Sequence, residues 1–134
     1  MEFFAFLDLS VLSNLAVPDW AKPVQIANDF PEPGVMLVSA GLEKPDAVRT
    51  RSGKTVDYSG DSRMRMISVL AQQGDSGGPV FDLSGRLVAI NTAVGVVYRT
   101  EVKTFTIRNG DLVIRNVIPE HGTLVTDVTG GLVR

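Results

Sequence analysis

Residues 74–93 read Gly-Asp-Ser-Gly-Gly-Pro-Val-Phe-Asp-Leu-Ser-Gly-Arg-Leu-Val-Ala-Ile-Asn-Thr-Ala. Three glycines surround Ser76, and because glycine has no Cβ, the backbone here can adopt turns closed to other residues. Such turns let consecutive N–H groups point to one side of the loop, beside an exposed hydroxyl. Acyl transfer needs both features, because the hydroxyl attacks a carbonyl and preorganised N–H donors stabilise the oxyanion that forms.

The loop at residues 74–79, here called the nucleophile loop, therefore predicts a serine nucleophile at Ser76. The N–H groups of Gly74 and Ser76 are the expected oxyanion-hole donors. The alternative is a glycine-rich hairpin turn with a solvated serine. That turn would not require glycine at three of six positions, followed by Pro79 at the entry of a strand.

The rest of the chain consists of short apolar segments separated by turn signals, without long amphipathic helices. Together with 13 Gly and 7 Pro, this pattern predicts an all-β fold, an antiparallel β-barrel or sandwich of about six to nine strands. Hairpin turns are expected at Ser52-Gly53, Leu83-Ser84-Gly85 and Asn109-Gly110. Strands are expected over residues 3–12, 35–40, 55–58, 63–70, 79–82, 86–92, 96–107, 111–117 and 123–128.

Composition excludes several classes of function. A length of 134 residues suits one domain, and a net charge of -2 gives no basic footprint for nucleic acid. With no Cys and one His, we expect no disulfide, no metal site and no cofactor. The N-terminus lacks the basic residues of a signal peptide, and the uncharged run between Asp8 and Asp19 is shorter than the ~20 residues of a membrane span. No membrane partner is expected, and the compartment stays open.

The nucleophile loop is similar to the motif of trypsin-like serine proteases, which have the chymotrypsin fold. Residues 80–93 resemble the bacterial branch that includes the HtrA/Deg proteases. Residues 34–41 resemble the first strand of the family's second barrel, and Asp8-Leu9-Ser10-Val11-Leu12 resembles the segment with the triad aspartate. The resemblance implies that residues 34–134 form the C-terminal β-barrel of the chymotrypsin fold. Residues 1–33 would be the end of the first barrel and the interdomain connection.

The same resemblance implies a serine endopeptidase with a polypeptide substrate, and it assigns further residues. Asp8 would be the carboxylate that orients the catalytic histidine; the alternative is an Asp that ends a strand and caps a turn. Asp75, Gly77 and Gly78 would support the nucleophile loop. In many members the residue at Asp75 pairs with a freed α-amino group. No activation sequence is recognisable here, so Asp75 would simply brace the loop.

The resemblance places the substrate pocket on both sides of the nucleophile loop, at Leu70, Ala71, Thr92 and Ala93. Leu70 would lie near the pocket floor, where trypsin itself carries an aspartate. Without an acid, the pocket cannot compensate a buried Lys or Arg, so small or medium apolar side chains are the expected occupants. The alternative is that these residues belong to the barrel core, because a strand buries every second side chain.

The usual base is missing from the expected place. In this family a His lies about 45 residues before the triad Asp, but only seven residues precede Asp8 and none is a His. The one histidine, His121, is expected in a surface turn, with a Ser76–His121 dyad as the alternative.

Three explanations fit this gap. The chain is the C-terminal part of a longer protease, or a second chain supplies the barrel with the His, or the protein has lost catalysis and keeps a peptide-binding cleft. We favour the first, because an intact nucleophile loop has little purpose without a base. In each case an apolar face should be exposed and should invite a homodimer or another partner. Its expected members are Phe3, Phe4, Phe6 and Leu7.

Three functions therefore compete. The leading one is a serine endopeptidase that works through an acyl-enzyme. The second is a catalytically inactive, protease-derived β-barrel that binds peptides or a partner chain, and the third is a capsid-type or autoprocessing viral protease domain.

Overall fold

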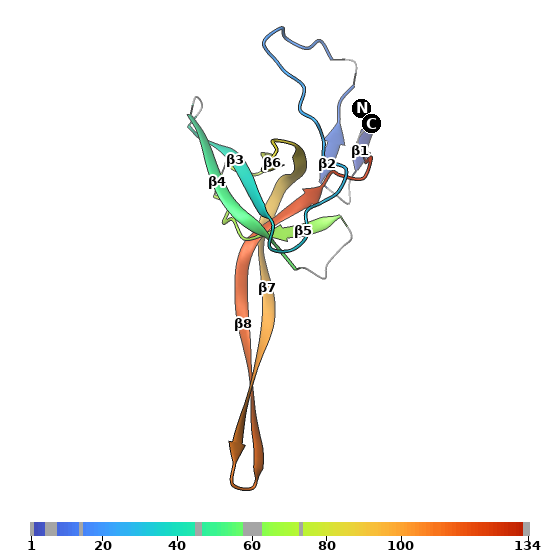
Figure 1. Ribbon diagram of the computed structural model, residues 1–134. Helices are drawn as coiled ribbons and strands as arrows, with labels where there is room; N and C mark the ends of the chain where they lie inside the picture. Colours follow the sequence, from blue (N-terminus) through green and yellow to red (C-terminus); the bar gives the residue numbers. More distant parts are fainter. Residues whose placement is uncertain are drawn as a thin grey trace.

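The computed structural model describes residues 2–4, 8–13, 15–44, 47–57, 63–72 and 74–132. Its main body is a closed barrel of six strands in the order β3-β4-β5-β8-β7-β6 (Figure 1), and all neighbouring strands run antiparallel. The expected all-β antiparallel barrel is thereby confirmed. The strands are β3 (Met36–Lys44), β4 (Ala47–Val56), β5 (Met64–Ile67), β6 (Pro79–Asp82), β7 (Leu87–Ile107) and β8 (Gly110–Asp127).

The first residues form a separate two-stranded sheet of β1 (Glu2–Phe4) and β2 (Leu9–Val11). One continuous strand over residues 3–12 was therefore a wrong prediction, because the chain turns near Asp8, which has a positive φ of 51°. The expected apolar face at Phe3, Phe4, Phe6 and Leu7 lies outside the side chains that the structure describes. No helix in the described part of the chain is long and apolar enough to cross a membrane.

The barrel core is small and aliphatic. Buried side chains from five of its strands meet there, and Phe30 of the connection before β3 packs against them. The connection is also held by backbone hydrogen bonds to β7, from Ala27 N–H to the Leu87 carbonyl at 2.9 Å and from Leu87 N–H to the Gln25 carbonyl at 2.8 Å. The core residues are Ala27, Leu37, Ile67, Val69, Val80, Val88, Ala89 and Val125.

Of the three expected turns, one is confirmed, one lies a residue earlier and one is wrong. Leu83-Ser84-Gly85 joins β6 to β7, with Gly85 at φ 82°. Arg108-Asn109 joins β7 to β8, and Gly110 of the expected Asn109-Gly110 turn is the first residue of β8. Ser52-Gly53, in contrast, lies inside β4. A Cβ on Gly53 would come within 2.4 Å of Val69 Cγ2, so this glycine permits a close approach of the chain segments and does not form a turn.

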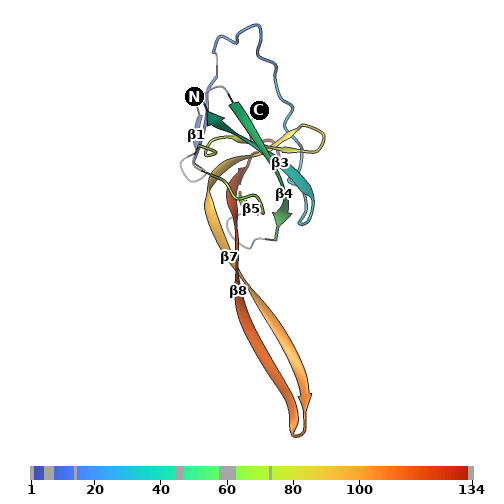
Figure 2. The same cartoon turned by 90° about the vertical axis from the view of Figure 1, so that its left-hand side faces the viewer.

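Strands β7 and β8 continue far beyond the barrel as a twisted two-stranded ribbon (Figures 1 and 2). β6 covers β7 only as far as Ile90, and β5 covers β8 only from Thr123 onwards. Breaks expected near residues 93–95 and in Ile118–Gly122 were wrong, because the two strands stay paired throughout this region. The ribbon comprises residues 95–107 and 110–122.

Candidate active site

The nucleophile loop leaves β5 and leads into β6, and it holds the Ser76 side chain exposed. Gly74 and Gly77 adopt positive φ values of 96° and 82°, which only glycine adopts at little cost. Gly77 N–H donates to the Asn91 carbonyl at 2.8 Å, and Asn91 N–H donates to the Gly78 carbonyl at 2.9 Å. The loop is therefore tied to β7 on both sides of the Gly77–Gly78 peptide.

The other side of the loop lies directly on β3. A Cβ on Gly78 would come within 2.4 Å of the Ala40 carbonyl oxygen, and a Cβ on Gly41 would come within 2.0 Å of Asp75 Oδ1. No side chain fits between these backbones. The two glycines thus allow β3 and the loop to approach closely enough to fix the position of Ser76.

Asp75 is 4% exposed and anchors the loop to β4. Its Oδ1 lies 2.6 Å from Arg49 Nη2, and its Oδ2 accepts a hydrogen bond from Gln72 N–H at 2.7 Å. Burial alone would raise the pKa of Asp75, but the Gln72 hydrogen bond and the Arg49 guanidinium outweigh it and lower the pKa below 3.8. The sequence analysis did not identify Arg49, which lies 26 residues before its partner and belongs to no recognisable motif.

Two backbone N–H groups remain unused next to Ser76. Among the described residues, neither Gly74 N–H nor Ser76 N–H donates a hydrogen bond within the chain. Exposed donors on a fixed loop are the arrangement that stabilises an oxyanion. Together with the exposed hydroxyl of Ser76, this loop can hold both the attacking oxygen and the charge that develops on a carbonyl.

Two pockets flank Ser76. The first, of about 280 Å³, lies toward β7 and β8. Of the four residues expected there, Ala71 and Ala93 line it, whereas the Leu70 side chain is 53% exposed and lies outside the lining. Thr92 is also outside the lining and shares a hydrogen bond of 2.9 Å with the Thr126 hydroxyl. The full lining is Ala71, Gln72, Ser76, Asn91, Ala93, Val94 and Thr123.

Asn91 and Thr123, which the sequence analysis did not identify, stiffen the wall of this pocket. The buried Asn91 side chain donates from Nδ2 to the Ser39 hydroxyl at 2.8 Å. The Thr123 hydroxyl donates to the Val69 carbonyl at 2.5 Å and accepts from Ala71 N–H at 2.8 Å. Both hydroxyl contacts link β8 to the segment that leads into the nucleophile loop.

The second pocket, of about 400 Å³, lies on the other side of Ser76, against β3 and β4. Its lining includes Leu42 and Val48, whose side chains are 53% and 70% exposed. Ser76 therefore stands between two cavities, one on each side of the nucleophile loop.

Asp8 and His121 are not brought to Ser76 by any described contact or shared pocket. Asp8 is exposed at the turn before β2. His121 is exposed within β8, opposite Val96, so its expected place in a turn was wrong. It precedes the pocket residue Thr123 by two positions. No group of three His, Cys, Asp or Glu side chains capable of holding a metal occurs in the described ranges.

Comparisons with known proteins agree on one class of protein. A model of the peptidase S3 family, described as alphavirus core protein, matches residues 32–124. A probable periplasmic serine endoprotease, DegP-like, of Bartonella henselae is 34% identical over 91 residues, and its namesake of Rhizobium meliloti is 32% identical over 91 residues. Each match covers 68% of this chain but only 16% of the relative. No solved structure matches the chain significantly.

Proposed function

The chain belongs to the peptidase S3 family, whose members have a chymotrypsin-like serine protease fold, and from this membership we propose that it provides the nucleophile-bearing barrel of a serine-type endopeptidase. The barrel over residues 34–134 would be the C-terminal one, and residues 1–33 the end of the first barrel and the connection between the two. The observation that carries the proposal is the exposed Ser76 beside the unused N–H groups of Gly74 and Ser76.

The reaction follows from this arrangement. Ser76 Oγ attacks the carbonyl carbon of the scissile peptide bond, and the electron pair of the C=O bond moves onto the oxygen, which the two N–H groups stabilise. The collapse of this intermediate expels the amine, which takes up the proton that Ser76 lost. Water then attacks the acyl ester, releases the carboxylic acid and restores the Ser76 hydroxyl.

A base must accept the Ser76 proton, because a serine hydroxyl is a weak nucleophile without one. We propose a histidine on a first barrel, carried by the same protein or by a second chain, with Asp8 as the carboxylate that orients it. His121 is the alternative base, two residues from Thr123 in the pocket wall.

The pocket toward β7 and β8 is the proposed site for the side chain that precedes the scissile bond. Its volume of about 280 Å³ suits a small or medium side chain, and its described lining carries no carboxylate. A buried Lys or Arg would stay unpaired there, at a cost of several kcal/mol by general estimates. Substrates with Ala, Val or Thr before the scissile bond should therefore be preferred over those with Lys.

The second candidate is an inactive barrel that binds peptides or a partner chain. The exposed Leu42 and Val48 beside Ser76 favour this candidate, because apolar side chains can bind a peptide without cleaving it. His121 also lies far from the nucleophile loop along the chain. In this case a peptide would occupy both pockets and remain intact.

The experiment that separates the two candidates uses a peptide library, the wild-type chain and Ser76→Ala, with cleavage and binding read separately. With a histidine-bearing first barrel from a DegP-like relative added, the endopeptidase predicts cleavage after small uncharged residues that disappears in Ser76→Ala, while peptide binding persists. Binding without cleavage in both proteins, also after addition of a histidine-bearing first barrel from a DegP-like relative, would overturn the proposal in favour of the binding module.

A further inference from the structure

The ribbon has two free edges. Within the ribbon, the described residues of β7 pair only with β8. Each of the two strands therefore presents its outer backbone N–H and C=O groups to solvent. Such edges are templates for pairing with another strand, and proteins usually blunt them with proline, charge or a covering segment.

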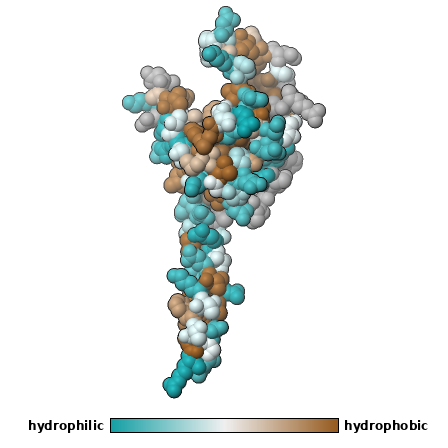
Figure 3. All heavy atoms as spheres, viewed as in Figure 1, coloured by the Kyte–Doolittle hydropathy of each residue, from teal (hydrophilic) through white to brown (hydrophobic). Residues whose placement is uncertain are grey.

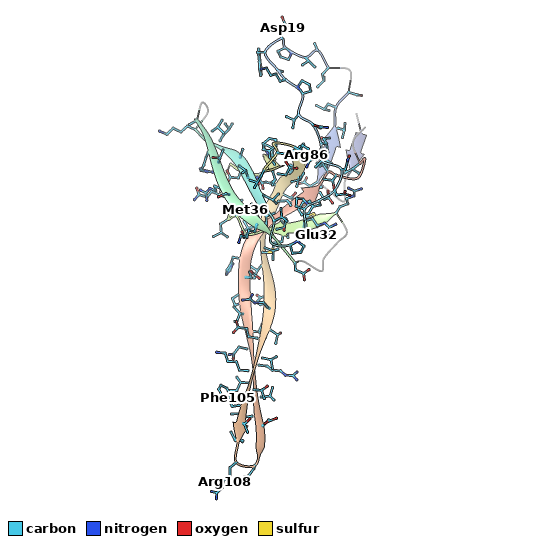
Figure 4. All side chains as sticks on the ribbon, in the orientation of Figure 1. Asp19, Glu32, Met36, Arg86, Phe105 and Arg108 are labelled. Atoms are coloured by element: carbon cyan, nitrogen blue, oxygen red, sulfur yellow. The ribbon has the colours of Figure 1, made fainter. Side chains whose placement is uncertain are left out.

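The side chains of the ribbon are unusually apolar for an element without a core. Nine large apolar side chains on it are exposed among those described, and Figure 3 shows hydrophobic and hydrophilic groups mixed down its length. Successive residues of a strand face opposite sides, so Val96, Tyr98, Thr100, Val102 and Thr104 share one face of β7. Figure 4 shows Phe105 and Arg108 near the far end, where their side chains project away from both strands.

The chain exposes more surface than expected for a folded monomer of its mass, which suggests that a partner covers part of it. A folded monomer of 14.4 kDa exposes about 6,800 Å², whereas this chain exposes 9510 Å². The excess of about 2,700 Å² exceeds the roughly 800 Å² that each partner buries in a standard interface. Figure 1 shows that the ribbon and the connection of residues 15–25 stand away from the barrel.

Only one of the two edges is uninterrupted by proline. Pro119 lies on β8 opposite Tyr98, and because proline has no N–H, its ring nitrogen must face the outer edge rather than β7. Residues alternate between hydrogen-bonded and non-hydrogen-bonded pairs. The outward N–H groups of β7 are therefore those of residues 96, 98, 100, 102 and 104. The β8 edge is interrupted by Pro119, whereas β7 contains no proline from Leu87 to Ile107.

We propose that the β7 edges of two copies of this chain pair antiparallel about a two-fold axis at Thr100, so that the two ribbons form one four-stranded sheet. In this register Thr100 faces Thr100 of the second copy, and Tyr98 faces Val102 of the second copy. Both are favourable cross-strand pairs of aromatic or β-branched residues. An isologous contact of this kind closes at two subunits.

Charge selects the same register. Arg99 of each copy lies opposite Glu101 of the other, so the axis at Thr100 creates two opposite-charge pairs from adjacent residues of one strand. Within one chain the Arg99 and Glu101 side chains already approach each other to 4.0 Å and are 61% and 44% exposed. The ribbon carries three Lys or Arg and three acidic side chains, so two copies do not repel each other strongly.

A pair of proline variants tests the seam in the full chain. Thr100→Pro removes an outward N–H of β7, whereas Val117→Pro, at the position that faces Thr100 across the ribbon, removes an outward N–H of β8. By sedimentation velocity, the wild type and Val117→Pro should have twice the 14.4 kDa mass of one chain, and Thr100→Pro the mass of one. A monomeric wild type, or a Thr100→Pro dimer as stable as the wild type, would overturn the proposal.

Charge variants test the register without a change of backbone. Arg99→Glu alone places like charges opposite each other and should weaken the dimer at least tenfold, as should Glu101→Arg alone. The double variant restores both pairs and should return the dissociation constant to within about threefold of the wild type. A double variant as weak as either single one would exclude this register.

Two further measurements keep the outcome unambiguous. Circular dichroism melting of Thr100→Pro should match the wild type measured at a concentration below the dimer dissociation constant, since the barrel core lies elsewhere.

Flotation with phosphatidylcholine–phosphatidylglycerol vesicles tests whether a lipid surface, and not a second copy, covers the apolar side chains of the ribbon. A monomeric chain that floats with these vesicles would assign the ribbon to a lipid surface and overturn the dimer. Ser76→Ala should dimerise like the wild type, so the dimer and the proposed peptidase fail or hold separately.

Discussion

Arg49 Nη2 lies 2.6 Å from Asp75 Oδ1, and this contact joins β4 to the loop that carries Ser76. The two side chains are 17% and 5% exposed, so water solvates neither charge well. Each charge therefore depends on the other as its partner. The resemblance to trypsin-like proteases had offered a freed α-amino group as a partner for this carboxylate. Here an internal arginine, Arg49, pairs with the carboxylate and braces the nucleophile loop.

Arg49→Met should therefore loosen the nucleophile loop more than it disturbs the barrel. It leaves the Asp75 carboxylate buried without its cation, which should cost about 3 kcal/mol in the free energy of unfolding. Urea denaturation measures this cost. Lys54→Met is the matched control, because it removes an exposed cation from the same strand and should change stability by less than about 0.5 kcal/mol. Equal effects of the two variants would contradict the role given to Arg49.

The lowered pKa of Asp75 predicts an acid-dependent part of the stability. A carboxyl whose folded pKa lies below its ordinary value of 3.8 stabilises the fold above that value. This stabilisation is lost as the pH falls through the lowered pKa. The difference in unfolding free energy between the wild type and Asp75→Asn should thus be largest at neutral pH and shrink below about pH 4. The comparison is needed because the lowered pKa of Asp82 acts in the same range, and a difference that stays constant down to pH 2 would contradict the prediction.

The close approach of the loop to β3 predicts unequal effects at two adjacent glycines. Gly78→Ala would force a Cβ to within 2.4 Å of the Ala40 carbonyl, whereas a Cβ on Gly77 would meet nothing within 4 Å. Gly77→Ala carries only the strain of a positive φ, about 1 to 2 kcal/mol. Gly78→Ala should cost clearly more and displace Ser76. Urea midpoints of the two variants provide the measurement, and a smaller loss for Gly78→Ala would show that the loop does not rest on β3.

Much of the fold could be predicted from the sequence because its signals are local. The hairpin ends near Leu83-Ser84-Gly85 and Asn109-Gly110 follow from residue type, and the pattern of residues 74–93 carries both a loop and two strands. Local signals also misled the prediction where a residue has a tertiary role. Gly53 looks like a turn residue but allows close packing against Val69, and Pro119 looks like a break but sits on an exposed edge where no ladder bond is lost.

Only part of the candidate site could be predicted from the sequence. The glycine motif identifies Ser76 and its neighbours by residue type, and the resemblance to trypsin-like proteases pointed to Ala71 and Ala93, which line the pocket. Arg49, Asn91 and Thr123 contribute through long-range pairing between strands, which leaves no spacing pattern in the sequence. The roles proposed for Asp8 and for an external histidine stay predictions.

The central claim is that Ser76 is a nucleophile with its own oxyanion donors, and that no base lies beside it among the described residues. The most direct test is the rate at which a fluorophosphonate labels Ser76, located by peptide mapping, as the concentration of neutral imidazole is raised. Imidazole can stand in for the missing histidine as proton acceptor, so labelling at Ser76 should rise with imidazole in the wild type, fall in Arg49→Met and vanish in Ser76→Ala. If folded wild-type chain is not labelled at Ser76 at any imidazole concentration, the loop is no nucleophile site and the account is wrong.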